Sequence, residues 1–386
     1  MDRPLLSTSH LANGLRRLVA DIAAPNGPTG SGLSDVICAE SDLISFGDQQ
    51  IRFCGIDVCE LANEHSFESV IWLLLNGDLP TLEELSDACA VMSESAVVEP
   101  TASETVAGLP LRTRPLDLLP LSISLISYFD PTPADRTTGA THSRVWRVLA
   151  QLPVLFSVAF GQPLDDGRAT DPQDGGGLSF AGSLLQVLRS DQRPPSPREE
   201  AAMNAVLTCQ CLTEMRPACF AARVVGSTVN DVVCALRASA SLFVAQLHND
   251  PYQWTAEKLS SFPSPQHAEV WWKSRKSRGM PFGFSGANDD PRPRILKAHC
   301  RELLGCATRV RMEAAAARLE RLMENDQQQY PTMDWTAARL LALLDVPPER
   351  ISLAIGMARL AGWAAHAIEH HASGVSLLPS LRYASE

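Results

Sequence analysis

Helix-start signals recur along the chain, and they constrain its fold more than any other feature. Thr81 and Glu84 form a capping box ahead of a segment with helical spacing. Ser196, Pro197 and Glu199 give a second start signal, with serine as the cap and proline at the first helical position. These signals predict helices that begin at about residues 82 and 197.

Two further segments have the composition of helices. Residues 67–76 are short and apolar and are followed by Gly77, which favours a helix that ends at that glycine. Residues 310–323 are rich in alanine, arginine and glutamate, all strong helix formers. The long apolar stretches at residues 116–129 and 351–368 are either too short for a membrane span or interrupted by polar residues, which predicts buried core helices.

Strand signals are few. The best candidate is a hairpin of residues 43–46 and 50–53 that turns at Gly47 and Asp48. We therefore predict an all-α protein with a minor N-terminal β-hairpin. Its 386 residues, 45% of them hydrophobic, are enough for a large core and for two domains.

Charge and cysteine content narrow the class of function. A formal net charge of -11 argues against non-specific binding to nucleic acid or to an anionic membrane, so neither is predicted as a partner. The ten cysteines show no regular disulfide framework, and the N-terminus does not resemble a secretory leader. Both observations predict a cytoplasmic protein. Cys209 and Cys211 could suggest a metal, but no second Cys/His pair stands nearby at zinc-ligand spacing, so no metal is predicted.

Several blocks of the sequence, in order, resemble the signatures of one family. Residues 53–81 read FCGIDVCELANEHSFESVIWLLLNGDLPT, a long match to the signature of the citrate synthase family. Residues 220–228, 290–297 and 357–366 match later blocks of that family. The resemblance covers about residues 32–384.

The resemblance implies the fold and the partners. It implies the citrate synthase fold, with an N-terminal extension at residues 1–31, a large helical domain at residues 32–216 and 336–386, and a small helical domain at residues 217–335. It also implies a dimer and small-molecule substrates. We predict either a homodimer or a heteromer with a complete citrate synthase. The reaction would condense an acyl-CoA such as acetyl-CoA with a 2-oxo acid such as oxaloacetate, with acyl-CoA as co-substrate and no bound cofactor.

The same resemblance implies the site residues. Asp334 would be the carboxylate that removes a proton from the thioester's methyl group, and His248 would polarise the ketone. Thr213 stands where we assign the histidine that stabilises the enolate oxygen, and another histidine of that block is replaced by Gln210. Arg359 and Arg382 would bind substrate carboxylates, since the planar guanidinium binds them in a bidentate manner.

Each of these residues also has a purely structural interpretation. Asp334 could be a helix cap before Trp335, His248 could be a structural histidine, and Arg359 could neutralise an acidic neighbour between packed helices. The segment at residues 281–286 lacks the histidine and arginine that the resemblance implies. Two hypotheses therefore stand: a condensing acyltransferase with altered or weak activity, and a catalytically inactive homologue that binds a metabolite or regulates an active synthase.

Overall fold

The computed structural model describes residues 36–47, 49–110, 112–162, 179–191, 193–275 and 282–379. The chain divides into two compact units, Met1–Glu40 and Ser41–Glu386. The first unit is described only over residues 36–40, which form no regular element. The predicted extension at residues 1–31 therefore lies outside the described residues, as do Asp48 and Arg382.

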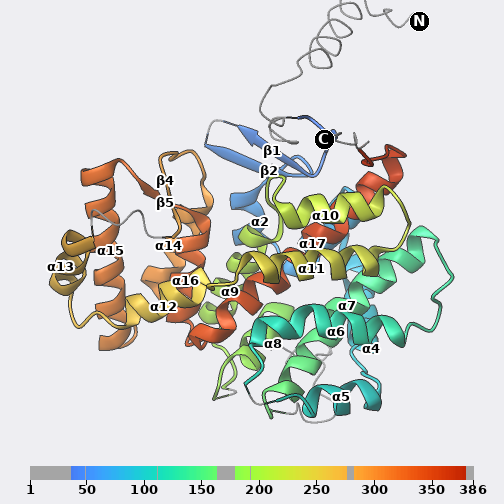
Figure 1. Cartoon of the computed structure of the whole chain (residues 1–386), viewed down its shortest axis with the longest axis horizontal. Helices are drawn as coiled ribbons and strands as arrows, with labels where there is room; N and C mark the ends of the chain where they lie inside the picture. Colours follow the sequence, from blue (N-terminus) through green and yellow to red (C-terminus); the bar gives the residue numbers. More distant parts are fainter. Residues whose placement is uncertain are drawn as a thin grey trace, which may run out of the picture. The chain divides into compact units, whose positions relative to one another are not determined.

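The second unit is mostly helical (Figure 1), which confirms the predicted fold class. Its elements, in chain order, are β1 (Ile44–Gly47), β2 (Gln50–Phe53), β3 (Ile56–Asp57), α2 (Val58–Glu64), α3 (Phe67–Asn76), α4 (Leu82–Ser95), α5 (Pro100–Ala107), the 3-10 helix η1 (Pro115–Asp117), α6 (Leu118–Tyr128), α7 (Thr138–Ala159), α8 (Phe180–Leu188), α9 (Pro197–Cys211), α10 (Pro217–Gly226), α11 (Val232–Gln246), α12 (Pro251–Ser260), α13 (Pro265–Arg275), β4 (Phe284–Ser285), α14 (Arg292–Glu302), α15 (Ala307–Gln327), β5 (Tyr330–Pro331), α16 (Met333–Leu343) and α17 (Pro348–Ser373).

The local signals place the helix ends correctly. Thr81 and Glu84 form the capping box that starts α4, and Ser196 and Glu199 form the one that starts α9. Helix α3 ends at Gly77, whose φ of 92° is a conformation that glycine adopts at little cost. These helix predictions are confirmed because each depends on interactions within a few residues of the chain.

The predicted hairpin is also confirmed, with its first strand displaced by one residue. β1 pairs antiparallel with β2, in the register Ile44 to Phe53. β2 pairs in turn with β3, so the sheet has three strands. β4 and β5 form a second, two-stranded antiparallel sheet, which the sequence did not predict.

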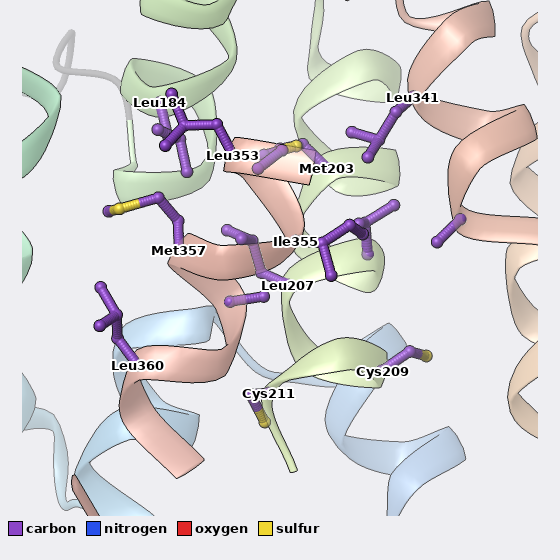
Figure 2. Close-up of a cluster of buried hydrophobic side chains, with 14 of the residues drawn as sticks. Leu184, Met203, Leu207, Cys209, Cys211, Leu341, Leu353, Ile355, Met357 and Leu360 are labelled. Atoms are coloured by element: carbon purple, nitrogen blue, oxygen red, sulfur yellow. The ribbon is translucent and has the colours of Figure 1, made fainter. Parts of the chain in front are cut away.

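Helix α17 is the central element of the core. It packs against α9, α10, α11 and α12. Figure 2 shows its side chains Leu353, Ile355, Met357 and Leu360 beside apolar side chains of α8, α9 and α16. By length and composition α17 could cross a membrane, but 94% of its most apolar window is buried inside the structure. The prediction of a core helix at residues 351–368 is therefore confirmed.

The ten cysteines are free thiols. Cys209 and Cys211, at the end of α9, are buried in the core (Figure 2). Among the described residues, no group of three or more His, Cys, Asp or Glu side chains is arranged to hold a metal ion.

The division into a large and a small domain stays a prediction. The unit from Ser41 onward is a single compact unit. Helices α10 and α11, which begin the predicted small domain, pack on α17 of the predicted large domain.

Candidate functional site

A cavity of about 210 Å³ lies where four segments meet. Its walls are the strands β1 and β2, the linker between α9 and α10, the loop that precedes α14, and the start of α16. Thr213, Glu214 and Arg216 come from the linker, Asp289 and Asp290 from the loop before α14, and Arg292 from the first position of α14. Segments more than 100 residues apart thus form one concave site.

A proline fixes the end of the linker between α9 and α10. Helix α9 ends at Cys211, and Leu212 already has extended backbone angles. Pro217 begins α10, and a proline disfavours helical angles in the preceding residue, so Arg216 is extended as well. Residues 212–216 therefore cross from one helix to the next and line the cavity on the way.

Asp334 is held by three side chains from three parts of the chain. It lies in the first turn of α16 and is only 6% exposed. Its Oδ2 accepts a hydrogen bond from Nη1 of Arg216 at 3.1 Å. Its Oδ1 accepts from the hydroxyl of Tyr252 at 2.8 Å and from Nη2 of Arg359 at 3.3 Å. The N-cap of α16 is Thr332, so the carboxylate joins helices rather than capping one.

These contacts set the protonation state of Asp334. Burial by itself would raise the pKa of the carboxyl group, but the positive charges of Arg216 and Arg359 and the Tyr252 hydrogen bond outweigh it and lower the pKa below the ordinary value. The carboxylate is therefore ionised at neutral pH, with both oxygens engaged. A base in this state is weak, because every donor that stabilises the anion opposes its taking up a proton.

Arg359 is tied to the protein's own polar groups. It is 3% exposed, and its Nη2 donates to Oε1 of Gln210 at 2.7 Å as well as to Asp334. Gln210 also donates through Nε2 to the carbonyl of Met333 at 3.3 Å. Its Nε is buried and has no hydrogen-bond partner in the described part of the chain. Arg359 does not line the cavity, so its role in binding a ligand stays a prediction.

Thr213 lies in the cavity wall. Its side chain is 2% exposed and its hydroxyl lies 3.5 Å from the thiol of Cys219. A single hydroxyl thus stands at a position for which the resemblance implies an imidazole.

His248 lies apart from this group. It is exposed, in the turn between α11 and α12. In the described part of the chain it makes no hydrogen bond or ion pair, and it does not line the cavity. The structure therefore brings together Asp334, Arg359 and the Thr213 segment but not His248, and Arg382 lies outside the described residues.

Two residues of the site are not predicted from the sequence. Arg216 and Tyr252 contact Asp334 across 118 and 82 residues of sequence. Tyr252 is one of only four tyrosines, and Arg216 stands three residues after Thr213, but neither signal specifies a partner so distant.

A second buried cluster joins α10 to the end of α17. Nη2 of Arg223 donates to Nδ1 of His366 at 2.9 Å and to the hydroxyl of Ser41 at 3.0 Å, and it also binds the carboxylate of Glu369. Nη1 of Arg223 lies 3.4 Å from Nδ1 of His370. Because Arg223 is always a donor, Nδ1 of His366 must be an unprotonated acceptor. Burial and the charge of Arg223 lower the pKa of His366 to about 3.

This cluster predicts acid sensitivity of the fold. An unfolded His366 takes up a proton near pH 6.5 and the folded one only near pH 3, so its contribution to stability is complete above pH 6.5 and is lost as the pH falls. We expect the free energy of unfolding in urea to be about 2 kcal/mol lower at pH 5.0 than at pH 7.5 from this residue.

The variant His366→Gln isolates that contribution, because burial also lowers the pKa of His142, His299 and His370. The pH dependence should be shallower in the variant by about the same 2 kcal/mol. Equal slopes in the two proteins would show that His366 is not held neutral.

A family model and curated relatives of the chain all point to the same family of proteins. The family model described as "Citrate synthase, C-terminal domain" matches residues 32–379. "Citrate/2-methylcitrate synthase" of Bacillus subtilis (strain 168) is 27% identical over 362 residues, covering 91% of this chain and 95% of that protein. "Citrate synthase 2" of the same organism is 24% identical over 357 residues, again covering 91% and 95%.

Solved structures show the same fold. Citrate synthase from Thermoplasma acidophilum, in a ternary complex with carboxymethyl coenzyme A and oxaloacetate, has a TM-score of 0.80 at 19% identity. The match covers 94% of this chain and 97% of the Thermoplasma acidophilum chain. Citrate synthase from Pyrobaculum aerophilum has a TM-score of 0.81 at 21% identity, covering 94% of each chain.

Proposed function

Since this chain belongs to the citrate synthase family, we propose that the cavity beside Thr213 and Arg216 is its substrate site, and that it condenses an acyl-CoA with a 2-oxo acid only weakly. The condensation needs a carboxylate that removes a proton from the thioester's methyl group, and hydrogen-bond donors for the oxygens that gain charge. The proposal rests on the contacts of the carboxylate and on the residues that stand at the donor positions.

The state of Asp334 is the observation that carries the proposal. Its two oxygens accept hydrogen bonds from Arg216, Tyr252 and Arg359. To act as a base it would have to give up some of these bonds and protonate against two neighbouring positive charges. Its arrangement is that of an anchor between helices.

The donors are depleted as well. Gln210 and Thr213 stand where the resemblance implies histidines, and Gln210 is occupied by Arg359 and the Met333 carbonyl. Loss of one oxyanion donor slows an enzyme by about 10²- to 10³-fold. Together with a weakened base, this supports a rate at least about 10³-fold below that of ordinary enzymes.

The test is release of CoA from acetyl-CoA in the presence of oxaloacetate, followed with a thiol reagent beside a complete citrate synthase. Ordinary enzymes turn over at about 10 s⁻¹. We expect a turnover below about 0.01 s⁻¹, the value that a 10³-fold loss gives. A faster turnover would refute the proposal of weak condensation.

A second candidate function is a catalytically inactive subunit that pairs with a complete citrate synthase in the cytoplasm. It is favoured by the hydrogen bonds that join Arg359 to Gln210 and to Asp334, which engage the candidate base within the protein. Co-expression with a complete synthase from the same genome tests it. A mixed dimer would support this function, and two separate homodimers would support the weak enzyme.

A further inference from the structure

Arg216 is the cation that the cavity offers to a ligand. Its side chain is 47% exposed and lines the cavity, and only its Nη1 is engaged, by Asp334. In the described part of the chain, no hydrogen bond uses its Nε or Nη2. Two N–H directions of the guanidinium are thus open, which suits a carboxylate.

The other arginine of the wall is already occupied. Arg292 is 5% exposed, and its Nε and Nη2 bind the carboxylate of Asp290. Its Nη1 donates to the carbonyl of Leu212 at 3.1 Å. Arg292 therefore holds the linker in place and has little left to give a ligand.

Two carboxylates of the wall have no cation of their own. Glu214 and Asp289 are exposed, line the cavity, and form no ion pair within the described ranges. One open cation therefore faces two unpaired anions. A ligand with a single carboxylate can bind Arg216, whereas the second carboxylate of a dianion would add like-charge repulsion inside a cavity of about 210 Å³.

We infer that Arg216 is the specificity-determining residue of the cavity and that the cavity selects a small 2-oxo monocarboxylic acid over a 2-oxo dicarboxylic acid. The inference rests on the proposed function for the choice of site and for the 2-oxo group. The open face of Arg216 would hold the carboxylate, and Glu214 and Asp289 would disfavour a second one.

A matched pair of ligands tests the selectivity. 2-Oxobutyrate and oxaloacetate differ only in whether a methyl group or a carboxylate ends the chain. Titration calorimetry of the full chain at pH 7.5 should give an affinity for 2-oxobutyrate at least tenfold higher than for oxaloacetate. Tighter binding of oxaloacetate, or no binding of either acid, would overturn the inference.

Variants assign the effect to the residues. Arg216→Ala should weaken 2-oxobutyrate at least tenfold, and Arg216→Lys should restore part of the loss. Arg294→Ala removes an equal charge from an exposed arginine that does not line the cavity and should leave binding unchanged. The double variant Glu214→Gln, Asp289→Asn should strengthen oxaloacetate at least tenfold and 2-oxobutyrate much less.

Each variant is first checked for an unchanged circular dichroism spectrum, because Arg216 also contacts Asp334. Should Arg216→Ala unfold, the double variant alone decides the inference: equal gains for both acids would overturn it. These binding results are independent of turnover, so they can fail while the CoA-release assay succeeds, and the reverse.

Discussion

Replacing Asp334 by alanine is expected to lower the free energy of unfolding by about 3–5 kcal/mol, the cost of removing one partner from a buried ion pair. The variant leaves the guanidinium of Arg359 buried without a carboxylate and the Tyr252 hydroxyl without its acceptor. Urea unfolding followed by circular dichroism measures the loss.

The variant Asp334→Asn is the matched control. Its amide oxygen can still accept from Tyr252, but the charge that balances Arg359 and Arg216 is gone. The free energy of unfolding of Asp334→Asn should therefore lie between that of the wild type and that of Asp334→Ala. The direction of the effect distinguishes an anchor from a base. A carboxylate retained for catalysis is often a cost to stability, so its removal would leave the protein equally stable or more so. An unchanged or higher stability in Asp334→Ala would contradict the anchor.

The second large effect is expected from Gly362→Ala in α17. A Cβ at this position would lie 2.0 Å from the carbonyl oxygen of Cys211, at the end of α9. Because the obstacle is backbone, the two helices must separate, and we expect a loss of about 3 kcal/mol, at the upper end of the usual cost of overpacking. Arg359 lies one turn before Gly362, so its contact with Gln210 should loosen as well.

Gly139→Ala is the control for the change of residue itself. Gly139 lies in the first turn of α7, and a Cβ there meets nothing within 4 Å. Alanine should be neutral or stabilise the protein by up to about 1 kcal/mol, because glycine loses more backbone freedom on folding. Thermal unfolding of the two variants side by side gives the comparison. Equal effects would mean that α9 and α17 are not packed as closely as described.

The helices could be predicted because their signals are local. The capping boxes at Thr81 and Ser196 and the glycine at residue 77 act within one turn of helix, and each gave its boundary correctly. The β4–β5 pair could not be predicted in this way. Its strands lie far apart in the sequence, with 44 residues between Ser285 and Tyr330. Each has only two residues, which is too short to show any alternation.

The functional roles of the site residues stay predictions. Order and spacing of the family blocks brought Thr213, Asp334 and Arg359 into one hypothesis. The structure places Thr213 in the cavity wall and joins Asp334 to Arg359 and to the wall residue Arg216. The partners of Asp334 could not be predicted from the sequence, because Arg216 and Tyr252 contact it only in the folded chain. Their contacts change the chemistry of Asp334 from an available carboxylate to a saturated one, which residue identity cannot reveal.

The central claim, that Asp334 is an anchor rather than a base, is tested most directly by proton exchange. Acetyl-CoA is incubated with the protein in D2O, with saturating 2-oxobutyrate or oxaloacetate, and deuterium in the acetyl methyl group is followed by NMR. This exchange reports proton abstraction even when no condensation follows. We predict that any exchange above that in protein-free buffer is equal in the wild type and in Asp334→Asn. Exchange that the wild type catalyses and Asp334→Asn does not would contradict the claim.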